Sequence, residues 1–114
     1  MLKIEIKFTP STASVTLYGD GLDQPVKTKS SGYGYCKASD AMAKALNAAG
    51  VKLPKRAEGF GYSRKNGFKT GGIGVQSILH PFLSAGFAVI QHETESGSFV
   101  AIFKKSEIKN GFYN

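Results

Sequence analysis

Apolar and polar residues alternate strictly over residues 2–9, where one face carries Leu2, Ile4, Ile6 and Phe8. This period of two is typical of a half-buried strand. A second alternating stretch at 14–18 follows the turn around Pro10, so the two predict a hairpin. Near the other end, residues 87–92 and 98–104 are apolar on both faces and are joined by turn residues. They predict a second antiparallel hairpin, placed centrally in the sheet under the helices.

Two stretches between the hairpins have helical spacing of small and apolar residues. The first ends near Gly50 and carries Ala38, Ala41, Met42, Ala45, Leu46 and Ala49. The second ends near Gly86 and carries Val75, Ile78, Leu79 and Phe82. Because proline lacks an amide hydrogen, Pro81 indicates that this helix either ends near Leu79 or kinks.

The pattern as a whole predicts an α+β fold, with a mainly antiparallel sheet in the order β-β-α-ribbon-α-β-β and two helices packed on one face. Pro25 precedes a short extended piece at 26–29. Asn66-Gly67 predicts a short ribbon of residues 59–63 and 67–70. We expect one domain over 1–114, in which 105–114 form a polar tail.

Composition limits the cellular compartment expected for the protein. No apolar run approaches the ~20 residues of a membrane span, so we expect no membrane partner. A single cysteine, Cys36, excludes an internal disulfide and fits a reducing cytoplasm.

The positive charge is concentrated in one segment. The chain has a net charge of +7, and residues 27–69 hold ten lysines and arginines against Asp40 and Glu58, a local net of +8. The rest of the chain has five cations against six carboxylates, a net of −1. Such asymmetry predicts a polyanionic partner. A solvated surface that only maintains solubility is the alternative.

The same segment contains one motif twice, Gly-Tyr-Gly-Tyr-Cys-Lys at 32–37 and Gly-Phe-Gly-Tyr-Ser-Arg at 59–64. Glycine-rich loops also precede both predicted helices, and helix N-termini attract phosphate. The sequence therefore predicts a backbone cradle of Gly32, Gly34, Gly71, Gly72 and Gly74. Alternatively, these glycines only permit tight strand-to-helix turns.

These features together predict a binding surface for nucleic acid or a nucleotide. The predicted phosphate contacts are Lys27, Lys29, Ser31, Lys37, Arg56, Arg64, Lys65 and Lys69. The predicted base-stacking rings are Tyr33, Tyr62 and Phe68, while Tyr35 and Phe60 are expected in the core.

A wider pattern covers about residues 28–90. It consists of Gly-Tyr-Gly-Tyr-x-Lys-x-Ser at 32–39, Ala-Leu-Asn at 45–47, Gly-Gly-x-Gly-Val at 71–75, and then Leu79, Gly86 and Phe87. It resembles small accessory proteins of phages and prophages. The resemblance implies a viral protein in the cytoplasm of a bacterial host cell. It also implies a second hypothesis, in which the protein inhibits or sequesters a host defence component, either a protein or a nucleotide messenger.

Evidence for an enzyme is weaker. His80 and His92 are isolated in the sequence, and no Cys/His spacing predicts a metal site. We therefore expect a non-enzymatic module with no catalytic residue, cofactor or metal. Residues 82–87, followed by a hairpin with His92, resemble HicA-like ribonuclease toxins, which implies a ribonuclease as a third hypothesis.

Overall fold

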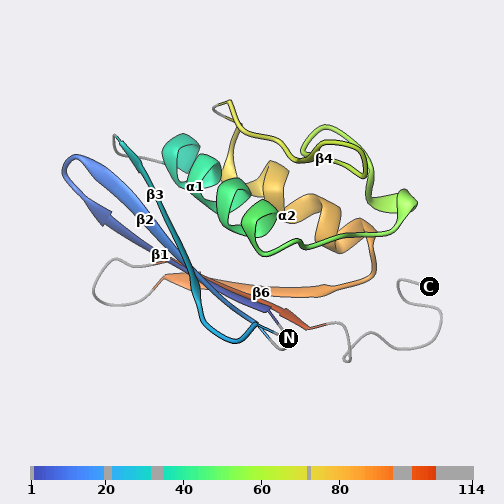
Figure 1. The fold of residues 1–114 in the computed structure, drawn as a ribbon, viewed down its shortest axis with the longest axis horizontal. Coiled ribbons are helices and arrows are strands. Elements are labelled where there is room, and N and C mark those ends of the chain that lie inside the picture. The colour runs from blue at the N-terminus through green and yellow to red at the C-terminus, as the bar shows by residue number, and fades with distance from the viewer. Residues whose placement is uncertain (1, 20–21, 32–34, 72, 94–98, 105–114) are drawn as a thin grey trace.

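A computed structural model describes residues 2–19, 22–31, 35–71, 73–93 and 99–104. It has two layers: a sheet, and on one of its faces two helices with a short ribbon (Figure 1). The elements in chain order are β1 (Leu2–Thr9), β2 (Thr12–Gly19), β3 (Val26–Ser31), α1 (Tyr35–Ala48), the 3₁₀ turn η1 (Lys55–Ala57), β4 (Tyr62–Ser63), β5 (Gly67–Phe68), α2 (Val75–Ser84), β6 (Ala88–Glu93) and β7 (Phe99–Lys104). The predicted α+β class is confirmed. The polar tail predicted at 105–114 lies outside the described residues.

The main sheet is antiparallel and has the order β3-β2-β1-β7-β6. Its central strand is β1, in which Leu2 pairs with Gly19 on one side and with Phe103 on the other. The prediction that both C-terminal strands are central is therefore right for β7 and wrong for β6, which forms an edge. The short piece predicted after Pro25 is a full strand, β3, at the opposite edge.

The core lies between the sheet and the helices. Period-two alternation turns Ile4 and Ile6 of β1, and Val15 and Leu17 of β2, towards the helices, where at most 1% of each is exposed. The predicted stripes of α1 and α2 are buried against them; Ala49 alone, just past the end of α1, is only partly buried. Because the α1 stripe is mostly alanine, this helix can lie close to the sheet.

The second helix continues through its proline. It runs from Val75 to Ser84 and buries Pro81, so the expectation of an end near Leu79 is wrong. Pro81 has no amide hydrogen to donate to the carbonyl of Ser77 one turn earlier. The backbone of Gly61 lies against that same carbonyl, so close that a Cβ on Gly61 would be 2.1 Å from its oxygen. Within the described ranges, neither helix is long and apolar enough to cross a bilayer.

Candidate ligand-binding surface on the ribbon

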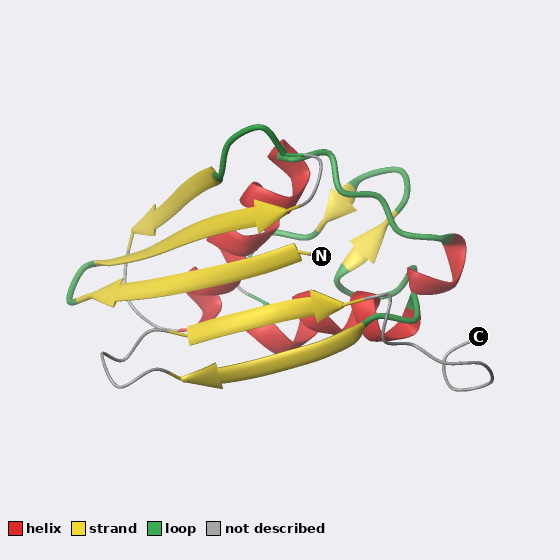
Figure 2. Ribbon diagram, turned by 90° about the horizontal axis from the view of Figure 1, so that it is seen from below, coloured by secondary structure: helices red, strands yellow, loops and turns green. Residues whose placement is uncertain are grey.

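The predicted ligand residues of β3 lie on the sheet face that points away from the helices, which we call the open face. Thr28 Oγ1 donates a hydrogen bond of 2.5 Å to the carbonyl of Ala41 in α1, and Ser30 is buried. Strand alternation therefore turns Lys27, Lys29 and Ser31 to the open face, which Figure 2 shows without helices in front of it. The sheet therefore separates these three residues from the predicted ligand residues on the helix layer.

Much of the first glycine loop is outside the described residues, including Gly32, Tyr33 and Gly34. Lys37 is exposed in the first turn of α1. On the helix-facing side of β3, the Ser30 hydroxyl is buried and has no hydrogen-bond partner within the described part of the chain. The predicted cradle at this loop stays a prediction.

The second glycine loop is tied to α1 by the protein's own side chains. The amide of Gly71 donates to Asp40 Oδ1 at 2.9 Å, and Ser39 Oγ donates to the carbonyl of Ile73. A carboxylate of the chain therefore occupies the position predicted for a phosphate at Gly71. Gly74 caps α2 with extended backbone, and Gly72 lies outside the described ranges. The loop thus fits the alternative in which its glycines permit a tight turn.

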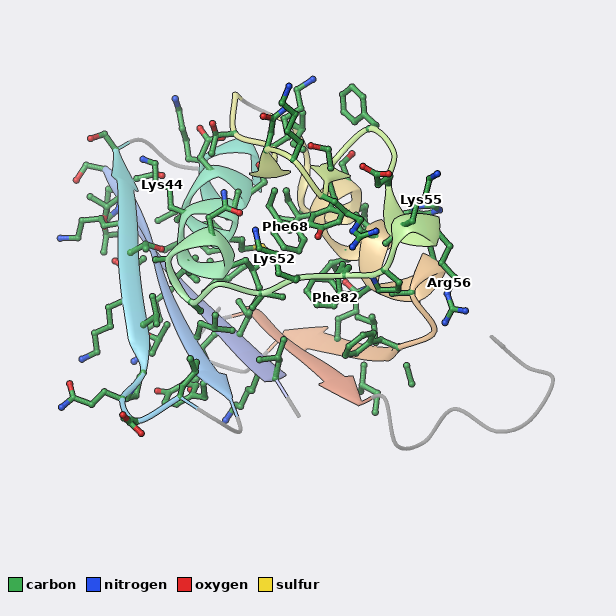
Figure 3. The ribbon with its side chains drawn as sticks, turned by 45° about the vertical axis from the view of Figure 1, so that its right-hand side comes forward. Lys44, Lys52, Lys55, Arg56, Phe68 and Phe82 are labelled. Atoms are coloured by element: carbon green, nitrogen blue, oxygen red, sulfur yellow. The ribbon has the colours of Figure 1, made fainter. Side chains whose placement is uncertain are left out.

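Arg56 has a structural partner. Its Nη2 donates to the carbonyl of Ala85 at 2.7 Å, just after the last turn of α2. A cation at this end of a helix interacts favourably with the carbonyl groups exposed there. Figure 3 shows Lys55 and Arg56 extending outward from η1. Arg56 therefore links η1 to α2, and its predicted contact with phosphate would compete with this hydrogen bond.

Two of the predicted stacking rings belong to the core. Tyr62 and Phe68 are 1% and 2% exposed, and their ring centroids are 4.7 Å apart. Phe68 also stacks on Phe82 of α2 at 5.5 Å, inside the molecule in Figure 3. The Tyr62 hydroxyl accepts from the amide of Leu53 at 2.9 Å. The prediction that Tyr62 and Phe68 stack on bases is wrong, because the ribbon lies flat on the helices and turns both rings inward.

The exposed ring is Phe60, which was expected in the core. It is 68% exposed, and Lys69 Nζ lies 4.4 Å from its ring centroid. Two backbone hydrogen bonds of 2.9 Å hold the loop, from the amide of Gly59 to the carbonyl of Tyr62 and from that of Lys69 to the carbonyl of Gly61. The sequence signal for this site was the placement of Phe60 between two glycines.

Phe60 lines two hollows. One, of about 370 Å³, is lined by the ring together with Ser63, Asn66, Lys69 and Thr70. The other, of about 230 Å³, is lined by the ring together with Glu58, Ser77, His80 and Ser84. Exposed Arg64 and Lys65 occupy the turn between β4 and β5. We call Phe60, Lys69 and the turn 64–66 the Phe60 surface; it combines a ring, three cations and the side-chain amide of Asn66.

The ribbon that carries this surface is anchored by Asn47 of α1. Its Nδ2 donates to the carbonyl of Phe68 at 3.0 Å, and its Oδ1 accepts from the amide of Phe68 at 2.8 Å. The amide side chain thus satisfies both backbone groups, as a neighbouring strand would. Gly67, with φ of 80°, lies so close that a Cβ would be 2.5 Å from Asn47 Oδ1. The sequence gives no local sign of this long-range contact.

The described residues offer little for catalysis. His80 is exposed, and its Nδ1 lies 3.5 Å from Ser84 Oγ, the outer limit of a hydrogen bond. The side chain of His92 lies outside the described part of the structure. Within the described ranges, no three His, Cys, Asp or Glu side chains gather where they could hold a metal.

No family model, curated protein or solved structure matches the chain. We therefore infer function from the Phe60 surface and its surroundings.

Proposed function

We propose that the protein is a non-enzymatic module that binds a phosphate-rich ligand, with nucleic acid as the first candidate, through the Phe60 surface. The observation that carries the proposal is an exposed phenylalanine with a lysine ammonium 4.4 Å from its ring centroid. A ring on exposed loop backbone can stack on any base, and neighbouring cations can meet the phosphates. Three exposed cations, Arg64, Lys65 and Lys69, lie in and just after the β4–β5 turn.

The expected binding strength follows from these few groups. One stacked base contributes ~1–3 kcal/mol. Each phosphate neutralised on a single strand adds about −0.7 to the slope of log K against log salt, so three cations give a slope of about −2. The surface should therefore bind weakly, and its affinity should fall as salt rises.

The shape of the surface favours a soluble nucleotide as the second candidate. The larger hollow, of about 370 Å³, lies within the ~300–1,000 Å³ typical of small-molecule sites. In that case a base would lie on Phe60, and its phosphate would meet Lys69 or Arg64. This is the ligand that a phage accessory protein acting on a nucleotide messenger would sequester.

A matched pair of aromatic variants tests the first candidate. Tyr18 is 39% exposed on β2 and has Lys3 Nζ 5.5 Å from its ring centroid, so it is a similar ring–cation pair on the open face. By fluorescence anisotropy with labelled single-stranded DNA and RNA at low salt, Phe60→Ala should weaken binding about 5- to 150-fold. Tyr18→Ala should leave it unchanged. An equal loss in both variants would contradict the proposal, as would undetectable binding of oligonucleotides and nucleotides alike.

Two lysine variants with the same net charge as each other locate the cationic contribution. Lys69→Gln should weaken binding and make the salt slope shallower by about 0.7. Lys29→Gln removes the same charge from the open face and should change little. A thermal-shift screen with mononucleotides and cyclic dinucleotides separates the two candidates. A shift with a small nucleotide, without binding of oligonucleotides, would select the second.

A further inference from the structure

One edge of the main sheet, at β6, pairs with no further strand among the described residues. Within the described residues, β6 pairs with β7 alone and lies at the border of the sheet in Figure 2. A strand in this position presents unpaired N–H and C=O groups on its outer side, which readily pair with another strand. The pairing of β6 with β7 is regular from Ala88 to Glu93, without a bulge that would twist the edge away.

The other edge differs. At β3, Lys27 and Lys29 are exposed, and Pro25 immediately precedes the strand. Lysine and proline are common means by which proteins keep edge strands from pairing. β6 contains neither, and in its middle Ile90 is 45% exposed. Its composition is therefore that of a strand that pairs.

The charge distribution selects a second copy of this chain as the partner. Residues 27–69 carry a local net charge of +8, whereas residues 88–93 carry only the charge of Glu93. Two copies can therefore approach at β6 with less repulsion than where the cations lie. Identical strands that run antiparallel about a two-fold axis are also self-complementary.

We propose that two copies of the protein pair through the outer edges of β6, which joins their sheets into one of ten strands. Ile90 lies opposite Ile90 of the second copy, and Ala88 lies opposite His92. This register covers both isoleucines and keeps the two helix layers on the same side of the joined sheet. If the proposed function also holds, two Phe60 surfaces would face the same side and could bind one strand together.

Solution mass gives the first test, by light scattering after gel filtration over a wide range of concentration. The wild type should reach twice the 12.2 kDa of one chain. Ile90→Lys should shift it to the mass of one chain, with its circular dichroism unchanged. Tyr18→Lys places the same charge on an inner strand of the open face and should leave the dimer intact. A wild type that stays monomeric, or dissociation by both variants alike, would overturn the proposal.

Crosslinking tests the register and does not depend on a destabilising variant. In a Cys36→Ser background, which removes the only cysteine, Ile90→Cys should form a disulfide with its counterpart under mild oxidation. Directly opposite Cα atoms are ~4.5–5.5 Å apart, within disulfide range. Gln91→Cys would lie about 8 Å from its counterpart and should crosslink poorly. Equal crosslinking at both positions, or none at Ile90→Cys, would overturn the register and the pairing with it.

Discussion

Replacing Asn47 should release the ribbon from the helix layer. The side chain makes two hydrogen bonds to one residue, at 3.0 Å with the carbonyl and 2.8 Å with the amide of Phe68. Phe68 is 2% exposed, and its ring packs between Tyr62 and Phe82. In Asn47→Ala both backbone groups of Phe68 would lose their side-chain partner.

The size of the effect follows from those two bonds. Each contributes a net ~0.5–1.5 kcal/mol, and a buried group left unsatisfied costs ~1–3 kcal/mol. Alanine favours a helix more than asparagine does, which offsets up to about 0.7 kcal/mol. We expect Asn47→Ala to lower the free energy of unfolding by about 2–4 kcal/mol. Asn47→Asp keeps the acceptor but places a carboxylate oxygen against the carbonyl of Phe68, so it should also destabilise.

Urea denaturation followed by far-UV circular dichroism measures these differences. Lys44→Ala is the control, because Lys44 is exposed on the same helix and should change the free energy of unfolding by no more than about 0.5 kcal/mol. Gly67→Ala should also destabilise, and by less in the Asn47→Ala background, because the clash with Asn47 Oδ1 is then absent. An Asn47→Ala variant as stable as Lys44→Ala would refute the reasoning.

Two other perturbations have equally specific outcomes. Gly61→Ala forces a Cβ against the carbonyl of Ser77 in α2, so urea denaturation should show a free energy of unfolding lower by about 1–3 kcal/mol. In the control Gly59→Ala, the new Cβ meets no atom within 4 Å, so the free energy of unfolding should hardly change. Equal losses in the two variants would contradict the packing of Gly61 on α2. The Glu5 carboxylate raises the pKa of Tyr18 above its ordinary value of 10.0. The protonated Tyr18 therefore stabilises the folded state below about pH 10, and this contribution is lost as the pH rises through the pKa of Tyr18 in the folded protein. Ultraviolet titration of tyrosinate should contain a component that moves to lower pH in Glu5→Gln, and an unchanged titration would show that Glu5 is not the cause.

The sequence predicts the elements of the fold well, because their periodicity is local. Alternation in β1 and the alanine stripe of α1 each correspond to a buried face in the structure. Strand order is harder to predict from the sequence. The apolar residues on both faces of β6 predicted a central strand, but β6 lies at an edge. The central position belongs to β1, because it pairs with strands from both ends of the chain. No local pattern records such a pairing.

The Phe60 surface lies in the segment for which the sequence predicts a binding site, but its exposed ring is not one of the rings predicted to stack. In an extended strand Phe60 and Tyr62 would lie on the same face. From the sequence, Phe60 is expected in the core and Tyr62 on the surface, whereas in the structure Phe60 is exposed and Tyr62 is buried. The structure separates them because β4 is only two residues long and the loop bends at Gly61. What turns Tyr62 inward is its hydroxyl contact with Leu53 and its packing on Phe68, both of which depend on the folded neighbours.

The place of β1 between β2 and β7 has a consequence for synthesis of the chain. The meander β1–β2–β3 emerges from the ribosome before β7 and can form from neighbouring residues. One side of β1 stays unpaired until β7 has been synthesised, because Leu2 pairs with Phe103 of that strand. Until translation reaches that point, the nascent protein presents β1 as an open template. Chaperone binding and premature association should concentrate on this intermediate, and chains shortened before β7 should aggregate rather than fold.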